Sequence, residues 1–208
     1  MTRAPGLYAV ILAAGESTRM GTDKALLPWP PAAPGSRPGG HTFLSAAIRS
    51  LEPFSEKVIV VAGRNESNLA PVVYANGASL VRNPEPDRGQ FSSLQAGLQE
   101  VLNHGRDAAM VTLIDRPPVK AATLQALCSA FTESASHVWA VVPEYNGKHG
   151  HPFLLAREMI EAFLKAPSTA TARDIEHQNL LHVEYVVVDD PLVTLNVDTP
   201  EEYAALSR

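Results

Sequence analysis

The chain of 208 residues has the length of one globular domain, and we expect residues 1–208 to form a single domain. Its composition is ordinary for a globular protein, with 45% hydrophobic and 19% charged residues. The net charge of −5, from 17 lysines and arginines against 22 aspartates and glutamates, argues against general affinity for nucleic acid or an anionic membrane, because such binding requires excess cationic side chains.

The N-terminal segment "MTRAPGLYAVILAAG" contains an apolar stretch of only about seven residues, which is shorter than a secretory signal or a membrane span requires. We therefore expect a cytoplasmic protein that does not insert into membranes. The one cysteine, Cys128, lies in the apolar pattern "LQALCSAF". This setting predicts a small buried hydrophobic residue rather than a reactive thiol.

Apolar runs alternate with segments of helical period along the first two thirds of the chain. The runs predict buried strands, the periodic segments predict helices, and their alternation predicts right-handed βαβ crossovers. The sequence therefore predicts a three-layer α/β fold, with helices on both faces of a mostly parallel sheet. The expected strands are Leu7–Ala13, Lys57–Ala62, Ser79–Val81, Ala109–Ile114 and Val138–Pro143, and the expected helices cover 42–51, 92–102 and 121–131.

The pattern after Gly147 is less regular. Strands are expected near Phe153–Leu155, Val183–Val188 and Leu192–Asn196, and helices near Arg157–Leu164, near Ala172–Gln178 and from Pro200. The segment "WPPAAPGSRPGG", residues 29–40, is too rich in proline and glycine for a strand or helix and predicts a flexible surface loop. It is not a domain linker, because the alternation of strands and helices resumes directly after it.

The loop in "VILAAGESTRMGTDKALLPW", residues 10–29, follows the first predicted strand. Loops at the carboxyl ends of parallel strands form the ligand crevice of such sheets. This one fits neither a Walker A motif nor a dinucleotide fingerprint, because its glycines have the wrong spacing. Its small-residue turn lets backbone amides approach a ligand, and Arg19 and Lys24 can reach phosphates. The alternative is a mobile loop with two solvated charges. As a solvated loop residue, Lys24 is expected to contribute little to stability.

The segment "LAAGESTRMGTDK" resembles the signature of the MobA-like nucleotidyltransferases, which make and modify molybdenum cofactor with a nucleoside triphosphate. Four further segments follow in the family's order: "NPEPDRGQFSSLQAGL", "LIDRPPV", "GKHGHPFLL" and "NVDTPEEY". The chain looks closest to the molybdenum cofactor cytidylyltransferase (MocA-like) branch, because Ala14 stands where the guanylyltransferases usually have glycine. The resemblance implies a Rossmann-like fold of the nucleotide-diphospho-sugar-transferase type and an enzyme that uses CTP.

Two aspartates carry the metal prediction. Asp115 ends the apolar run "AAMVTLI", where its carboxylate either caps a turn or holds Mg²⁺ together with substrate phosphates. Asp198 precedes "TPEEY", in which Thr199 and Glu202 form a capping box, so Asp198 is left without a structural role. The resemblance implies that both aspartates are metal ligands, with Asn196 as a weaker candidate.

The resemblance also implies the reaction: a terminal phosphate of molybdopterin attacks the α-phosphorus of the nucleotide, and pyrophosphate leaves. Positioning and charge neutralisation carry most of such catalysis. Arg19, Lys24 and Asp115 are the implied catalytic residues. The implied acceptor side contains Gly150, His151 and Pro152. The implied nucleotide site comprises Leu12, Ala13, Ala14, Gly15, Arg19, Lys24, Ser92, Ser93 and Leu94, although Ser92 or Ser93 would serve equally well as a helix N-cap.

The chain departs from the family pattern at several positions. Ile114 and Arg116 flank Asp115 where the family usually has Gly-Asp-Gln-Pro, Gln90 replaces a usual methionine, and no Gly-Asp-x-Gly precedes the Ala-Arg pair at Ala172. The sequence leaves open GTP as the nucleotide, another phosphorylated acceptor, and a noncatalytic carrier that hands cofactor to a molybdoenzyme partner. The two histidines of "GKHGHPF" lack further ligands at zinc-site spacing, so we expect no zinc there.

Overall fold

The computed structural model describes residues 6–15, 20–31, 40–167 and 169–206. Its centre is an eight-stranded sheet in the order β10-β7-β9-β6-β1-β4-β5, with β8 paired to β7. A separate small sheet pairs β2 with β3. The strands are β1 (Leu7–Leu12), β2 (Pro28–Trp29), β3 (His41–Thr42), β4 (Lys57–Ala62), β5 (Ser79–Arg82), β6 (Ala108–Leu113), β7 (Ala140–Tyr145), β8 (Lys148–His149), β9 (Phe153–Ala156) and β10 (Val183–Val187).

The strands of the large sheet run mostly in parallel. β1 pairs in parallel with β4 and β6, and β4 pairs in parallel with β5. β9 is antiparallel to both of its neighbours, β6 and β7, whereas β10 is parallel to β7. Every residue of β6 is buried, as expected for a strand that is covered on both faces. The predicted mostly parallel α/β sheet is confirmed.

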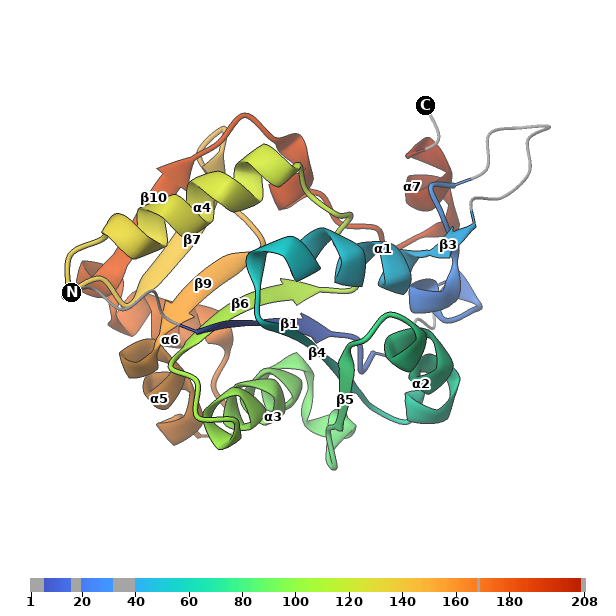
Figure 1. Cartoon of the computed structure of the whole chain (residues 1–208), viewed down its shortest axis with the longest axis horizontal. Helices are drawn as coiled ribbons and strands as arrows, with labels where there is room; N and C mark the ends of the chain where they lie inside the picture. Colours follow the sequence, from blue (N-terminus) through green and yellow to red (C-terminus); the bar gives the residue numbers. More distant parts are fainter. Residues whose placement is uncertain (1–5, 16–19, 32–39, 168, 207–208) are drawn as a thin grey trace.

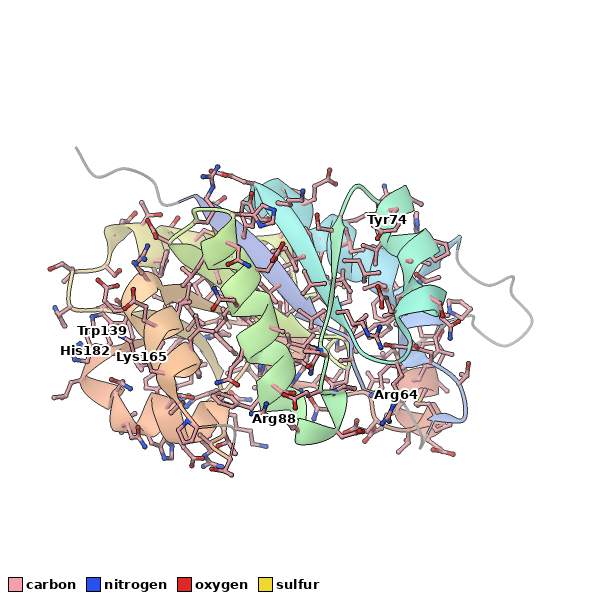
Figure 2. All side chains as sticks on the ribbon, turned by 90° about the horizontal axis from the view of Figure 1, so that it is seen from below. Arg64, Tyr74, Arg88, Trp139, Lys165 and His182 are labelled. Carbon is pink, nitrogen blue, oxygen red and sulfur yellow. The ribbon has the colours of Figure 1, made fainter. Side chains whose placement is uncertain are left out.

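Helices cover both faces of this sheet (Figure 1). Buried residues of α1, α2 and α4 form one core cluster, and those of α3, α5 and α6 form a second. Ala9 and Ile11 of β1 contribute to the first cluster, and Tyr8 and Val10 to the second, as the two-residue period of a strand requires. Figure 2 shows the layer of α3, α5 and α6 from outside, with α3 lying across the sheet. The helices are α1 (Phe43–Leu51), α2 (Glu66–Ala75), α3 (Gln90–Asn103), α4 (Ala121–Glu133), α5 (Arg157–Lys165), α6 (Ala172–Gln178) and α7 (Pro200–Ala205).

Short 3₁₀ helices connect several of these elements. One of them corrects the strand predicted at Leu192–Asn196: the chain turns at η6, because Pro191 starts the turn and the Asp190 carboxylate accepts a hydrogen bond from the Leu192 amide (3.2 Å). Helix α2 was not predicted from the sequence. The 3₁₀ helices are η2 (Lys24–Leu26), η3 (Glu52–Phe54), η4 (Pro86–Arg88), η5 (Leu180–His182) and η6 (Pro191–Thr194).

The predicted loop at residues 29–40 is only partly described. Trp29 belongs to β2 and pairs with His41, and its ring packs edge-on against Phe43 at 4.8 Å between centroids, so the loop prediction is wrong at Trp29. Residues 32–39 lie outside the described residues. No helix in the described part of the chain has the length and apolar character needed to cross a membrane.

Candidate active site

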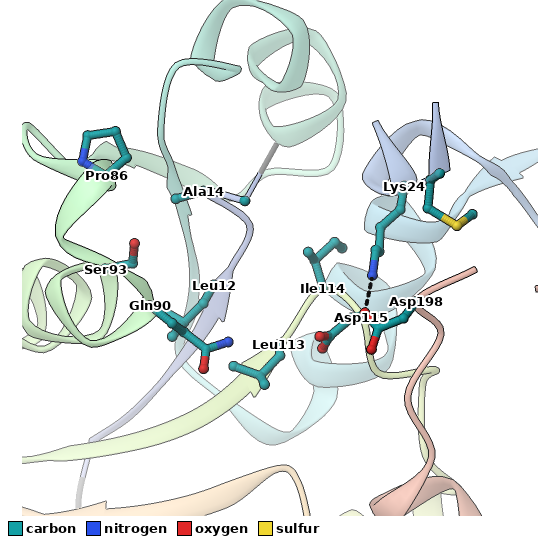
Figure 3. A pocket seen from close by; sticks show the side chains of 13 residues that line it. Leu12, Ala14, Lys24, Pro86, Gln90, Ser93, Leu113, Ile114, Asp115 and Asp198 are labelled. Carbon is teal, nitrogen blue, oxygen red and sulfur yellow. Dashed lines mark hydrogen bonds and ion pairs between the residues drawn. The ribbon is translucent and has the colours of Figure 1, made fainter. Parts of the chain in front are cut away.

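A cavity of about 290 Å³ opens at the carboxyl ends of β1 and β6 (Figure 3). The two strands are paired in register so that Leu12 lies opposite Leu113, and the loops that follow them therefore start side by side. This is the edge of the sheet where the sequence predicts a ligand crevice. Seven predicted site residues line the cavity: Leu12, Ala14, Gly15, Lys24, Ser93, Asp115 and Asp198.

Asp115 is fixed by backbone hydrogen bonds on both sides. The amide of Ile114 donates to the carbonyl of Leu12 (3.0 Å), and the amide of Val197 donates to the carbonyl of Asp115 (2.8 Å). One carboxylate oxygen, Oδ1, is buried and has no hydrogen-bond partner among the described residues. The position of Asp115 is therefore set by the main chain, and this oxygen serves no contact in the described part of the fold.

Asp190 shows what a structural aspartate in this chain looks like. It is fully buried, and its carboxylate accepts hydrogen bonds from the Lys120 amide (2.8 Å), the Thr123 hydroxyl (2.8 Å) and the Leu192 amide (3.2 Å). Buried carboxylates that serve the fold are normally satisfied in this way. Asp115 Oδ1 has no such partner among the described residues, and this difference argues against the capping role that the sequence left open for Asp115.

Burial raises the pKa of the Asp115 carboxyl, and the nearby charge of Asp198 raises it further. Lys24 and Arg116 act in the opposite direction and favour the ionised form. A bound cation would relieve both the desolvation and the repulsion between the two carboxylates. The site therefore has the chemistry of an oxygen-rich cation site.

Lys24 is not a solvated loop residue, so that prediction is wrong. It begins η2, where the Asp23 side chain caps the turn by accepting from the Ala25 amide (3.0 Å). The lysine is only 8% exposed, and its Nζ donates to the Val197 carbonyl (2.5 Å) and to Asp198 Oδ1 (3.2 Å). The C-terminal segment thus covers the lysine and brings Asp198 to the cavity.

Asp198 both takes part in the fold and lines the cavity, whereas the sequence assigned it no structural role. The predicted capping box is confirmed: the Thr199 side chain accepts from the Glu202 amide, and Glu202 in turn accepts from the Thr199 and Asp198 amides. The carboxylate of Asp198 pairs with Lys24, so it does take part in the fold, while it also faces the cavity beside Asp115 (Figure 3). Asn196 is exposed and does not line the cavity.

The two aspartates are a small ligand set. No group of three or more histidine, cysteine, aspartate or glutamate side chains that could hold a metal occurs in the described ranges. Two carboxylates nevertheless suit Mg²⁺, which usually takes one or two carboxylates and completes its shell with water and substrate phosphates. The buried Oδ1 of Asp115, which has no hydrogen-bond partner in the described part of the chain, supports this fit.

Several predicted nucleotide residues do not reach the cavity with their side chains. Ala13 and Leu94 are buried in the two core clusters. Neither serine is the N-cap of α3, because Gly89 occupies that position. Ser92 instead donates to the Gly89 carbonyl (2.7 Å) and does not line the cavity, whereas Ser93 does. Arg19 lies outside the described residues.

Two asparagines support the site and were missed by the sequence reasoning. Asn83 is buried, and its Nδ2 donates to the hydroxyls of Ser92 (2.8 Å) and Ser93 (2.9 Å). Asn65 donates from Nδ2 to the Ala13 carbonyl (3.0 Å) and to Asp23 Oδ2 (2.8 Å), so it ties the end of β1 to the turn that carries Lys24. A single asparagine carries no pattern that would have revealed these contacts.

A second and larger cavity, of about 690 Å³, lies next to the predicted acceptor segment. Gly150 and His151 line it, whereas Pro152 is buried and does not. A side chain at Gly150 is excluded, because a Cβ atom would lie 2.2 Å from the Val193 carbonyl oxygen. The cavity joins an apolar floor with a polar rim; its lining includes Ala140, Val142, Phe153, Leu155, Met159 and Phe163, and also Lys148, His149, Arg173, Glu176 and His177.

His151 is a neutral imidazole at physiological pH. Burial, with a smaller effect from the charge of Arg116, lowers its pKa to about 3. Its Nδ1 is buried and has no hydrogen-bond partner among the described residues. His149 is held differently: its ring stacks on Tyr185 at 3.8 Å between centroids and lies near Glu144 and Glu176. The two histidines are therefore held in different surroundings.

Comparison with known proteins adds an independent line of support. The sequence profile of the MobA-like NTP transferase domain matches residues 9–183. A probable molybdenum cofactor guanylyltransferase from Rhodopirellula baltica is 31% identical over 134 residues, which are 64% of this chain and 60% of that protein. A molybdenum cofactor cytidylyltransferase from Escherichia coli is 26% identical and aligns over 93% of this chain and 92% of its own length.

Solved structures agree in fold. The crystal structure of Rv0371c from Mycobacterium tuberculosis superimposes with a TM-score of 0.79 at 26% identity, over 99% of both chains. A structure of the same mycobacterial protein in complex with manganese has a TM-score of 0.68 at 23% identity, over 96% of this chain and 97% of that one. The predicted Rossmann-like nucleotidyltransferase fold is confirmed.

Proposed function

The chain belongs to the MobA-like NTP transferase family, and on that premise we propose that it transfers a nucleoside monophosphate from a nucleoside triphosphate, preferentially CTP, to the terminal phosphate of molybdopterin or molybdenum cofactor. An oxygen of the acceptor phosphate forms a bond to the α-phosphorus. The bond between the α-phosphorus and the bridging oxygen breaks, and pyrophosphate leaves. The product is a phosphoanhydride. The observation that carries this proposal is Asp115, which lines the cavity with Lys24 and Asp198 and whose buried Oδ1 has no hydrogen-bond partner among the described residues.

The smaller cavity suits the triphosphate. Ala14 and Gly15 offer main-chain groups that a ligand can approach, and Lys24 supplies a cation fixed in place. Asp115 and Asp198 would hold the metal. When bound, Mg²⁺ would neutralise phosphate oxygens and so favour departure of pyrophosphate. In this interpretation the protein contributes mainly pre-arranged charge, which is the usual contribution of proteins to phosphoryl and nucleotidyl transfer.

The larger cavity suits the acceptor. Its apolar floor can hold a flat heterocycle, and Lys148 and Arg173 at its rim can attract an anionic group. His151 adds a neutral imidazole that can take part in a hydrogen bond without adding charge. These properties fit a phosphorylated pterin, and the E. coli and R. baltica relatives carry names that refer to the same cofactor.

The preference for CTP rests on Ala14. Its side chain is partly exposed and lines the nucleotide cavity. A methyl group at this wall leaves less room for a base, which favours the smaller pyrimidine. The relatives include both cytidylyl- and guanylyltransferases, so the residue rather than the family carries this part of the proposal.

The deciding experiment measures pyrophosphate release with each of the four nucleoside triphosphates, with and without molybdopterin, in the presence of Mg²⁺. The expected result is release that depends on molybdopterin and is fastest with CTP. Faster release with GTP would reject the cytidylyl assignment and leave the transferase assignment standing. Binding of molybdopterin without pyrophosphate release from any nucleotide would support a carrier instead.

A further inference from the structure

The nucleotide cavity and the acceptor cavity meet at Gln90. Of the described residues, Gln90 is the one that lines both cavities. It is the first residue of α3, and Figure 3 shows its side chain among those directed into the nucleotide cavity. The reaction joins one atom of each substrate, so the new bond has to form where the two cavities meet. Gln90 is placed at this junction.

The carboxamide of Gln90 is also not used by the fold. The other two glutamines of α3 have partners: Gln95 donates to the carbonyls of Phe163 (3.0 Å) and Ala166 (3.1 Å), and Gln99 donates to Asn103 (3.0 Å). Gln90 is exposed and makes no side-chain hydrogen bond to another described residue. Its amide can therefore turn toward a ligand without breaking a contact of the protein.

The chemistry of the junction points to a phosphate. A carboxamide has two N–H donors, and a phosphate monoester offers only acceptors at neutral pH. Within the nucleotide cavity the buried cation Lys24 is held by Val197 and Asp198 on the C-terminal side. A neutral donor on α3 can bind the attacking phosphate without neutralising it. The phosphate then keeps the negative charge that makes it a nucleophile.

Resting on the proposed function, we propose that Gln90 is a specificity-determining residue that touches the acceptor: its carboxamide donates hydrogen bonds to the terminal phosphate of the acceptor where the two cavities meet. It thereby strengthens this chain's selection of acceptors that carry the phosphate, through a contact that the family's usual methionine does not make, and directs one phosphate oxygen toward the α-phosphorus. Because the carboxamide of Gln90 carries no charge and contacts the acceptor phosphate, we expect it to affect binding of the acceptor and not binding of the triphosphate.

The test compares Gln90→Met with wild type. Methionine keeps the unbranched shape and length of glutamine but cannot donate a hydrogen bond. Gln99→Met makes the same chemical change on the same helix, away from both cavities, and serves as the matched control. Binding of molybdopterin, and of the same pterin after removal of its phosphate, is followed by pterin fluorescence without nucleotide. Binding of CTP with Mg²⁺ is measured by calorimetry.

Gln90→Met is expected to weaken molybdopterin binding by about 10- to 100-fold, because a hydrogen bond to a charged group is lost. The preference for the phosphorylated pterin should fall by the same factor, while CTP binding and the melting temperature stay close to wild type. Gln99→Met should change none of these values.

Unchanged molybdopterin binding in Gln90→Met, or an equal loss for the phosphorylated and dephosphorylated pterins, would overturn the assignment of Gln90. An equal loss of CTP affinity would also overturn it, because the substitution would then have disturbed the start of α3 rather than a contact specific to the acceptor. Wild-type protein that binds both substrates but releases no pyrophosphate would reject the proposed function and not the Gln90 contact. Wild-type protein that does not bind molybdopterin would reject both.

Discussion

Replacing Asp115 by asparagine separates a metal ligand from a structural residue. The substitution keeps the shape of the side chain and removes its charge. In wild type the ionised Asp115 carboxyl is disfavoured by its partial burial and by the charge of Asp198, whereas Lys24 and Arg116 favour it. Asparagine carries no charge and therefore avoids both the desolvation and the repulsion. We expect the free energy of unfolding of Asp115→Asn without ligand to equal or exceed that of wild type.

The pH dependence of this difference follows from the raised pKa of Asp115. A carboxyl whose pKa is raised in the folded state contributes stability that is fully present below its unfolded pKa, near about 3.9, and is lost as the pH rises through the folded pKa. The asparagine variant does not undergo this loss. Its advantage over wild type should therefore be present at pH 7 and disappear toward pH 3, as measured by urea unfolding at each pH.

In the presence of ligand, wild type should be stabilised more than Asp115→Asn. At a ligand concentration of 100 times Kd, binding adds about 2.7 kcal/mol of stability, which for a chain of this length is a rise in Tm of about 5–11 °C. Asp115→Asn should lose most of the shift that Mg²⁺ and CTP produce together, and its turnover should fall by about 10²–10³-fold.

The control for this experiment is Asp189→Asn, which changes an exposed aspartate and should leave both readouts at the wild-type value. A destabilised Asp115→Asn protein with wild-type turnover would refute the reasoning and return Asp115 to a capping role.

Three further substitutions test other parts of the site. Lys24→Ala should lower turnover by about 10²–10³-fold and, unlike a change of a solvated lysine, also cost about 1–3 kcal/mol in urea unfolding, since the contacts of Lys24 with Asp198 and with the Val197 carbonyl are lost. His151 has a pKa of about 3, so wild type should lose about 2 kcal/mol of stability between pH 7 and pH 5 that His151→Gln does not lose, because the unfolded chain takes up a proton that the folded chain excludes. An equal loss in both proteins would contradict this, and His137→Gln, an exposed histidine, is the control. Ala14→Gly should raise kcat/KM for GTP relative to CTP; an unchanged ratio would show that this wall does not select the base.

The place of Asp115 in the fold and the start of α7 could be predicted from local sequence patterns. Asp115 follows a strand whose apolar run is unambiguous, and a carboxylate after a central parallel strand has to emerge at the ligand edge. The capping box at Thr199 predicted the start of α7, whereas the pairing of Asp198 with Lys24 was not foreseen. These predictions succeed because each depends on a few neighbouring residues whose backbone state is strongly determined.

The environment of Lys24 could not be predicted in this way. Its burial depends on a contact with Val197 and Asp198, at the other end of the chain. The roles of Asn65 and Asn83 likewise depend on hydrogen bonds between separate loops. A sequence pattern reports the state of its own segment, whereas these contacts exist only after several strands have been brought to a common edge.

The stretch of chain from η6 to the start of α7 contacts the walls of both cavities. Val197 donates its amide to the Asp115 carbonyl and accepts from Lys24 at its own carbonyl, so one residue holds both the cation and the main chain of Asp115. Four residues earlier, the Val193 carbonyl accepts from the His151 amide (2.8 Å) and lies so close to Gly150 that no Cβ fits. A displacement of this segment would therefore move the acceptor wall and the charged groups together. The absence of a side chain at position 150 thus lets the segment that carries Val193 lie directly against the wall of the acceptor cavity.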